Sequence, residues 1–300
     1  MNMTTLTLNL NSQSGDLEQR RRTAEMLVDR TQTLSIAPPV AFQVFMLTRG
    51  PDYTCEALVD LVRLDPNLTA QMLRVCNSVI FRGQAVSSLH EAVLRVGNGT
   101  LAEMAMSLTL GKMLAVRKTA YCPDPNALWR HSVQCALACR YLSTYCEGTP
   151  WKPDLAFTSG LLHDIGKMVI NSAPIADNAR IVKLMEENEM TMADAELEAL
   201  GADHAEIGGL ILERWNLPAE IVRGVRFHHS PEFDRTGLAS LIHVGNECAR
   251  VTAGSKAWAD FESALDPSAL TQLRLSVAKV KACWEDVVED VNAIEKFMWS

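Results

Sequence analysis

One short stretch of this 300-residue chain carries most of the information about its architecture: Gly160-Leu161-Leu162-His163-Asp164-Ile165-Gly166-Lys167. It places a histidine directly before an aspartate and ends in a lysine. Neutral imidazoles together with a carboxylate suit divalent transition metals such as Fe, Mn, Zn or Co. An aspartate between such ligands can bridge two ions, an arrangement that activates water for attack on phosphorus. In that chemistry Asp164 would bridge the ions, and Lys167 would stabilise a phosphoryl oxygen.

The other histidines fall on both sides of this stretch. The chain has seven histidines, and five of them lie between residues 131 and 229. A single histidine near a helix end is usually a surface or core residue, and His228-His229 could also cap a helix C-terminus. Their combination with the central stretch predicts one cavity in which the five imidazoles and Asp164 converge. We interpret His90 and His243, which lie outside this set, as structural or surface residues. The histidines of the set are His131, His163, His204, His228 and His229.

Composition indicates an ordinary globular protein built from helices. Hydrophobic residues make up 48% of the chain, whereas aromatic residues make up only 6%. Few aromatic residues together with many Leu, Ala, Val and Met favour helix packing over a β-sandwich, and no useful stretch alternates between apolar and polar residues. The net charge of −8 argues against broad nucleic-acid binding, which needs a basic face, although a local basic patch stays open.

The cysteines and the apolar segments predict a reduced, cytoplasmic protein. The eight cysteines include no CxxC pair and form no regular framework, so we expect reduced and mostly buried thiols. No apolar run approaches the roughly 18 to 20 residues that span a bilayer. The N-terminus has no basic segment followed by an apolar one, so it does not resemble a secretory signal.

Proline, glycine and capping signals divide the chain into short helices. We expect an N-terminal tail and helix in 1–30, with the helix from Asp16 to about Gln32, and a set of five or so short helices in 31–118. The linker Thr119–Asn126 contains two prolines and separates this set from a second helical part, 119–250. A C-terminal extension, 251–300, is predicted to contain helices at 267–281 and 283–298. The helices predicted for the second part are 127–145, 153–171, 175–188, 192–200, 203–215, 218–228 and 237–253.

The central stretch resembles the core motif of the HD superfamily of metal-dependent phosphohydrolases. Residues 31 to about 250, roughly three quarters of the chain, resemble an HDOD domain, the HD-related output domain. The resemblance implies an all-α, HD-like helical bundle with an N-terminal helical subdomain. It also implies a bacterial signalling protein from a group that has mostly lost catalytic power. The segments that carry it outside the central stretch are Pro38-Pro39, Asp65-Pro66-Asn67-Leu68, Cys76-Asn77-Ser78, Val86-Ser87-Ser88-Leu89, His204-Ala205-Glu206-Ile207-Gly208 and Leu212-Glu213-Arg214-Trp215-Asn216-Leu217-Pro218.

The related HD-GYP phosphodiesterases imply a division of the ligands between two metals. One metal would take His131, His163, Asp164 and an aspartate from a late helix, a position that Asn246 occupies here. The other would take Asp164, His204, His228 and His229. Since an amide is a weaker ligand than a carboxylate, the resemblance implies an impaired first site and a complete second one.

Two further departures from that pattern limit the chemistry. Ala127 stands where some relatives carry a glutamate ligand, so a third metal is not expected. The residues after His229 contain no Gly-Tyr-Pro, so hydrolysis of cyclic di-GMP is not expected either.

These residues leave three functional hypotheses open. The first is a regulatory module with a degenerate metal site, which binds a signalling protein or a small nucleotide-like ligand. The second is a metal-dependent phosphohydrolase acting on a nucleotide or a phosphodiester, with Asp164 and Lys167 as its catalytic residues; Asn246 argues against strong activity. The third is a scaffold in which the polar cluster is a hydrogen-bonded relic. The sequence also leaves open whether the chain forms a homodimer.

Overall fold

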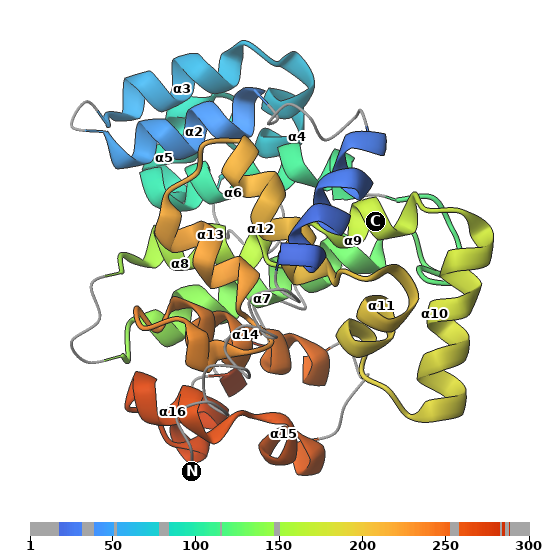
Figure 1. The fold of residues 1–300 in the computed structure, drawn as a ribbon. Coiled ribbons are helices and arrows are strands. Elements are labelled where there is room, and N and C mark those ends of the chain that lie inside the picture. The colour runs from blue at the N-terminus through green and yellow to red at the C-terminus, as the bar shows by residue number, and fades with distance from the viewer. Residues whose placement is uncertain are drawn as a thin grey trace.

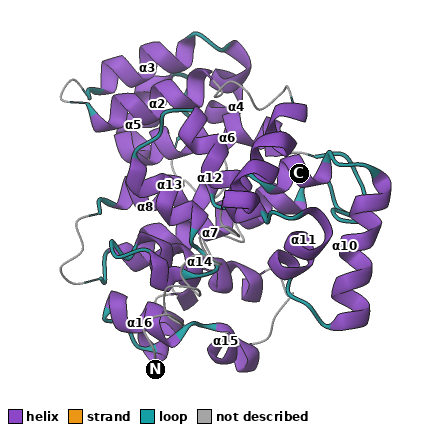
Figure 2. Ribbon diagram, in the orientation of Figure 1, coloured by secondary structure: helices purple, strands orange, loops and turns teal. Residues whose placement is uncertain are grey.

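The computed structural model describes residues 18–31, 39–50, 53–77, 84–114, 116–146, 151–252, 258–282, 284–285 and 288, and most of these residues lie in helices. No strand occurs in these ranges, as Figure 2 also shows. The all-α prediction is therefore confirmed. None of the described helices is both long and apolar enough to cross a membrane.

The N-terminal helices begin where the sequence supplies caps. The Thr54 hydroxyl accepts a hydrogen bond from the Ala57 N–H, and the Asp65 carboxylate accepts from two amides of the next helix. Ser88 accepts from the Glu91 N–H at 3.2 Å, as the Ser-x-x-Glu pattern predicts. These caps satisfy amides that have no partner within their own helix. The helices are α2 (Pro39–Arg49), α3 (Cys55–Arg63), α4 (Pro66–Cys76), α5 (Leu89–Val96) and α6 (Asn98–Leu114).

The second helical part is organised around α7, which packs against both α8 and α14. In Figure 1 the helices α2 to α5 lie at one end of the molecule, α7, α8 and α14 lie below them, and α15 and α16 lie at the opposite end. The elements are α7 (Ala127–Ser143), α8 (Pro153–Leu162), α9 (Lys167–Asn171), α10 (Ile175–Asn188), α11 (Met192–Leu200), α12 (His204–Arg214), α13 (Ala219–Arg226), η2 (Pro231–Phe233), α14 (Leu238–Thr252), α15 (Trp258–Ala264) and α16 (Pro267–Leu273). The division of the chain at residues 30, 118 and 250 stays a prediction.

The single helix predicted for 153–171 is wrong, because the chain turns between α8 and α9. Residues 163–166 form this turn. Gly166 lies so close to α12 that an added Cβ would be only 2.0 Å from the carbonyl oxygen of His204. The close approach of two backbones at this point explains both the turn and the glycine. The central His-Asp pair consequently lies in a turn and not on a helix face.

The C-terminal prediction needs a similar correction. The helix expected at 267–281 ends at Leu273, since Arg274 adopts a left-handed conformation with φ of 55°, and helix resumes at 277–282. α15 was not predicted. Most of the helix expected at 283–298 lies outside the described residues, as does Cys283.

The N-terminal helix is observed at 18–30 and packs on the second helical part. Arg21 forms an ion pair with Glu213 at 3.0 Å, and Asp29 forms one with Arg214 at 2.7 Å. The partner residues Glu213 and Arg214 are the last two residues of α12. The N-terminal helix is therefore held to the C-terminal end of α12.

The described cysteines are free, in agreement with the expected reduced thiols. Most are buried, although Cys55 and Cys122 are only half-buried. Cys135 and Cys139 lie one turn apart on α7 with their sulfurs 3.9 Å from each other, inside the core.

Candidate metal centre

Five separate segments of the chain bring the predicted site residues together. His131 lies in the second turn of α7, and His163 and Asp164 lie in the turn that follows α8. The other residues come from the N-terminus of α12, the turn after α13 and the middle of α14, in that order: His204, the pair His228 and His229, and Asn246. All of the sequence-predicted ligands thus meet around one point.

Asp164 occupies the centre of the cluster and is 1% exposed. Its Oδ2 lies 3.3 Å from His163 Nε2 and 3.5 Å from His131 Nε2. Its Oδ1 lies 3.2 Å from His204 Nε2. The potential ligand atoms form two groups, in each of which they lie within 4.8 Å of one another: His131, His163 and Asp164, and His204, His228 and His229. One carboxylate therefore lies between two imidazole groups.

Two buried imidazoles have a nitrogen without a hydrogen-bond partner. His163 Nδ1 donates to the Gly160 carbonyl at 2.8 Å, and His228 Nδ1 donates to the Val225 carbonyl at 2.7 Å. In a neutral ring this leaves the lone pair on Nε2, and neither Nε2 has a hydrogen-bond partner. Both nitrogens face Asp164, 3.3 and 3.9 Å from its oxygens. Lone pairs directed at a buried carboxylate repel it, and a cation between them removes the repulsion. The donor set therefore fits a divalent metal ion.

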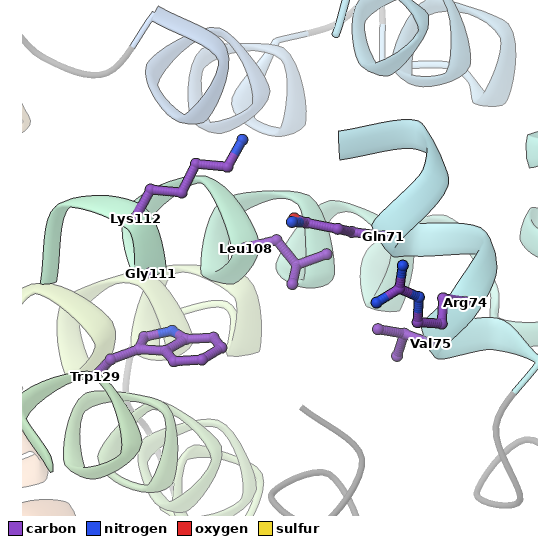
Figure 3. A pocket seen from close by; sticks show the side chains of 7 residues that line it. All are labelled: Gln71, Arg74, Val75, Leu108, Gly111, Lys112 and Trp129. Carbon is purple, nitrogen blue, oxygen red and sulfur yellow. The ribbon is translucent and has the colours of Figure 1, made fainter. Parts of the chain in front are cut away.

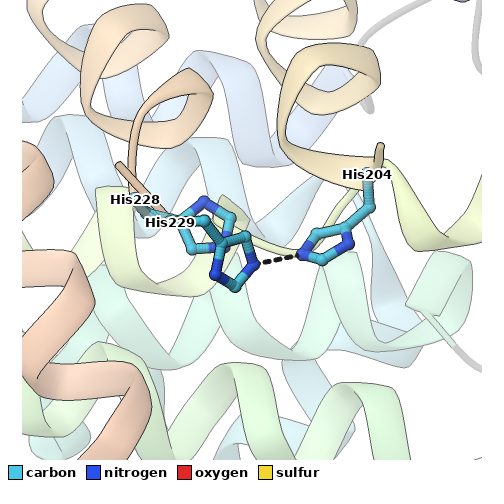
Figure 4. A group of neighbouring side chains, drawn as sticks. All are labelled: His204, His228 and His229. Carbon is cyan, nitrogen blue, oxygen red and sulfur yellow. Dashed lines mark hydrogen bonds between the residues drawn. The ribbon is translucent and has the colours of Figure 1, made fainter. Parts of the chain in front are cut away.

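His204 and His229 complete one side of the cluster. Their Nε2 atoms lie 2.8 Å apart. Figure 4 marks this contact with a dashed line and shows His228 beside it. His204 Nδ1 donates to Glu196 Oε2 at 2.6 Å. Glu196, on α11, is fully buried and was missed in the sequence, where it is one of two glutamates in an unremarkable helix. Only its distance from His204 in the folded chain reveals it.

In the metal-free chain the protonation states favour an anionic Asp164 beside neutral His131 and His228 rings and a cationic His204. Burial lowers the pKa of His131 to about 3 although Asp164 opposes it, and burial lowers the pKa of His228 far below its ordinary value. Burial would also lower the pKa of His204, but the carboxylates of Glu196 and Asp164 raise it to about 9. For Asp164 burial acts upward, yet the neighbouring His163 and Lys167 hold its pKa well below the usual range.

Lys167 and Asn246 each contact one residue of the cluster: Lys167 contacts Asp164, and Asn246 contacts His131. The ammonium of Lys167 lies 2.6 Å from Asp164 Oδ2, so in this structure it neutralises the aspartate. Asn246 Oδ1 accepts a hydrogen bond from His131 Nε2 at 2.8 Å. The ring nitrogen that would bind a metal on this side therefore carries a proton and points at an amide.

A cavity of about 180 Å³ gives access to the cluster. His131, Asp164 and Lys167 line one wall, and residues of the 116–126 segment, including Tyr121, line another. A second cavity of about 250 Å³ lies between α4, α6 and α7 (Figure 3). Its rim carries the cations Arg74 and Lys112 but no carboxylate or imidazole, so it offers no ligands for a metal.

The two remaining histidines have structural surroundings, as expected. His243 is buried in α14, where its Nδ1 donates to the His228 carbonyl and its Nε2 accepts from the Asp266 N–H. It therefore fixes the backbone of a cluster residue without facing the cluster. His90 is exposed and lies beside Arg63.

The fold and the cluster together define an HD-type helical protein with a central histidine–aspartate site. The family model described as the HDOD domain matches residues 34–231. The chain belongs to the HDOD family.

Comparison with known proteins supports the same fold. An uncharacterized protein of Treponema pallidum is 26% identical over 244 residues, which cover 79% of this chain and 46% of that protein. The chain thus spans about half the length of this curated relative.

Three solved structures share the architecture at low identity. An HDOD domain protein of unknown function from Geobacter sulfurreducens is 19% identical, with a TM-score of 0.75 over 94% of this chain and 99% of its own. A "Putative phosphohydrolase" from Shewanella amazonensis is 22% identical, with a TM-score of 0.69 over 90% and 97%. A "Putative signal transduction protein" from Marinobacter aquaeolei is 21% identical, with a TM-score of 0.74 over 96% and 66%. At these identities the likeness carries the fold alone.

Proposed function

We propose that this chain is a regulatory HDOD protein whose histidine–aspartate cluster binds one divalent transition metal, and that this ion and the adjoining cavity bind a small anionic ligand. The observation that carries the proposal is the buried Nε2 atom of His228, which has no hydrogen-bond partner and faces Asp164. On the other side of the same carboxylate, the Nε2 atom of His163 also faces Asp164 without a hydrogen-bond partner. A hydrogen-bonded relic would be expected to satisfy those atoms within the protein.

The ion would be held by the complete side of the cluster. Asp164, His204, His228 and His229 would supply one carboxylate and three imidazoles, a donor set typical of Zn, Fe, Mn or Co. A bound ion of this kind acts as a Lewis acid that attracts phosphoryl or carboxylate oxygens. Lys167 lines the cavity that reaches Asp164 and adds a positive charge to it.

The opposite side of the cluster favours regulation over catalysis. His131 Nε2 donates to Asn246, and no carboxylate from α14 takes the place of that amide. Efficient in-line attack on phosphorus normally uses two ions. A cluster with one strong and one weak position would bind an anion without the second ion that generates a nucleophile. The signalling name of the Marinobacter neighbour agrees with such a role.

A weak metal-dependent phosphohydrolase is the second candidate. It is favoured by the cavity that opens directly on Asp164 and Lys167, which would admit a phosphate ester to the cluster. The phosphohydrolase name of the Shewanella neighbour agrees with this alternative.

Metal analysis of untagged protein purified without chelators tests the proposal. We expect about one transition-metal ion per chain and only slow turnover of bis(p-nitrophenyl) phosphate. Asp164→Asn should lose the metal, whereas Asp177→Asn, a change at a half-buried residue of α10 outside the cluster, should keep it. Wild-type protein without metal, even after incubation with Mn²⁺, Fe²⁺ or Zn²⁺, would contradict the proposal. Two ions per chain with rapid turnover that Asp164→Asn abolishes would favour the phosphohydrolase.

A further inference from the structure

Glu196 is a buried carboxylate whose surroundings require an explanation. Its side chain is fully buried, and it lies on α11, outside the predicted set of ligands. Burying a carboxylate is strongly unfavourable unless hydrogen bonds or charges compensate it. Each of its oxygens has a defined donor, and these donors come from two different parts of the chain.

One oxygen of Glu196 fixes both the backbone and the ring of His204. Oε2 accepts from the His204 N–H at 2.7 Å and from the His204 Nδ1–H at 2.6 Å. The backbone N–H belongs to the first residue of α12 and has no partner within that helix. The ring can therefore rotate only by breaking a charge-assisted hydrogen bond. In the fixed orientation His204 Nε2 lies 3.2 Å from Asp164 Oδ1, on the side of the cluster that is complete.

The other oxygen of Glu196 is held by Tyr121. The Tyr121 hydroxyl donates to Oε1 at 2.5 Å, and both side chains are buried. Tyr121 belongs to the segment between α6 and α7 and lines the cavity that leads to Asp164. A continuous series of hydrogen bonds thus connects the cavity wall to one imidazole of the cluster.

We infer that Glu196 is a positioning residue for metal binding, which orients His204 so that its Nε2 faces the ion, and that Tyr121 holds Glu196 in place. The inference rests on the proposed function, since it presupposes that the cluster binds a metal. A carboxylate that accepts the second N–H of a ligating imidazole fixes the ring and strengthens the ligand, and its removal typically costs about 10- to 100-fold in metal affinity.

Titration of metal-free protein with Co²⁺, followed by visible absorbance, measures the effect. Glu196→Gln keeps the size of the side chain but removes its charge, and we expect the Co²⁺ dissociation constant to rise about 10- to 100-fold. Glu198→Gln lies on the same helix with an exposed side chain and should bind Co²⁺ as the wild type does. Tyr121→Phe removes one of the hydrogen bonds to Glu196 and should weaken binding by a smaller factor, up to about tenfold.

Each outcome separates positioning from a merely structural role. If Glu196→Gln lowers thermal stability but the folded variant binds Co²⁺ with wild-type affinity, the inference is overturned. If Glu196→Gln does not fold, Tyr121→Phe carries the test, and unchanged affinity in that variant also overturns it. A wild-type chain that binds no Co²⁺ contradicts the proposed function as well, whereas wild-type binding with unchanged variants contradicts this inference alone.

Discussion

The imidazoles around Asp164 differ in how their ring nitrogens are engaged. On one side Asn246 accepts a hydrogen bond from His131, so the ring nitrogen of His131 is already engaged. On the other side His228 Nε2 has no hydrogen-bond partner and faces the carboxylate. Asn246 is itself buried, with 4% of its surface exposed. Under the proposed function, the side-chain chemistry at this position would make the metal position on this side weaker than the one on the other side.

Replacing that amide by a carboxylate should restore the weak position. We expect Asn246→Asp to raise the metal content from about one towards two ions per chain, because a carboxylate binds hard and borderline divalent ions better than a neutral amide. In metal-free protein the same change adds a buried negative charge and should lower the melting temperature. Elemental analysis and thermal unfolding with and without Mn²⁺ check both effects. Asn188→Asp, at the exposed end of α10, is the matched control. Equal metal content in both variants would show that Asn246 does not limit occupancy.

Lys167 provides a second residue-scale test. Its ammonium lies 2.6 Å from Asp164, whose side chain is almost completely buried. Removing one partner of a buried ion pair typically costs about 3 kcal/mol or more because the other charge stays uncompensated. We expect Lys167→Met to lose stability of this order in metal-free protein and to recover much of it when a divalent ion is added. Urea denaturation with and without Zn²⁺ measures both. An equal loss in the two conditions would mean that no cation replaces the ammonium.

The residue scale also shows the limits of sequence reasoning. The histidines were predictable because the His-Asp pair and its flanking residues form a specific pattern. Glu196 and Tyr121 were not, since nothing in their local sequence separates them from ordinary amphipathic or linker residues. Their role depends on hydrogen bonds between residues 75 positions apart in the chain.

At the scale of elements, the turn between α8 and α9 positions the central pair. Its glycine, Gly166, is required by space, because its φ of −62° is accessible to any residue. An added Cβ would lie 2.0 Å from the His204 carbonyl oxygen, so the N-terminus of α12 would have to move. Helical periodicity predicted one helix over 153–171 because the apolar pattern continues through the turn. Periodicity records which residues are buried, and it does not record where two backbones come into contact.

We therefore expect Gly166→Ala to damage both stability and the cluster. The displaced backbone should cost about 3 kcal/mol or more, at the upper end of the range for overpacked sites. Metal affinity should fall as well, because His204 is the residue that must move. Chemical denaturation and Co²⁺ titration check the two effects. Gly99→Ala is the control, since the nearest atom to its added Cβ is 3.8 Å away and alanine favours helix. Similar behaviour of the two variants would contradict this account of the turn.

At the scale of the whole molecule, α6 and α7 join the N-terminal helices to the part that carries the cluster. The Trp129 indole on α7 donates to the Ser107 carbonyl on α6, and it packs on Gly111, where an added Cβ would lie 2.7 Å from the ring (Figure 3). Glu103 of α6 also forms an ion pair with Arg140 of α7 at 2.6 Å. Short-range patterns predicted both helices, but the pairing of the two parts followed only from the family resemblance, because contacts between distant segments leave no local signal.

The Glu103–Arg140 pair predicts a pH dependence of global stability. Burial raises the pKa of Glu103 to about 7 from an ordinary value of 4.5, although Arg140 opposes the shift. Asp154 of α8 adds to it. The folded chain therefore keeps this proton up to about pH 7, whereas the unfolded chain loses it near pH 4.5. Since the folded state binds more protons in this window, the stability that Glu103 contributes falls as pH rises through it.

Glu103→Gln should remove this dependence. The difference in unfolding free energy between variant and wild type should shift in favour of the variant by about 3 kcal/mol from pH 5 to pH 8, following the size of the pKa shift. Urea denaturation at a series of pH values measures it. The exposed Glu187→Gln on α10 should show no such change relative to wild type, because its side chain leaves the solvent little on folding. A constant difference between Glu103→Gln and wild type across the window would show that Glu103 stays ionised between α6 and α7. In that case Arg140 would fully compensate its burial, and the contact between the two helical parts would hold equally well at every pH in this range.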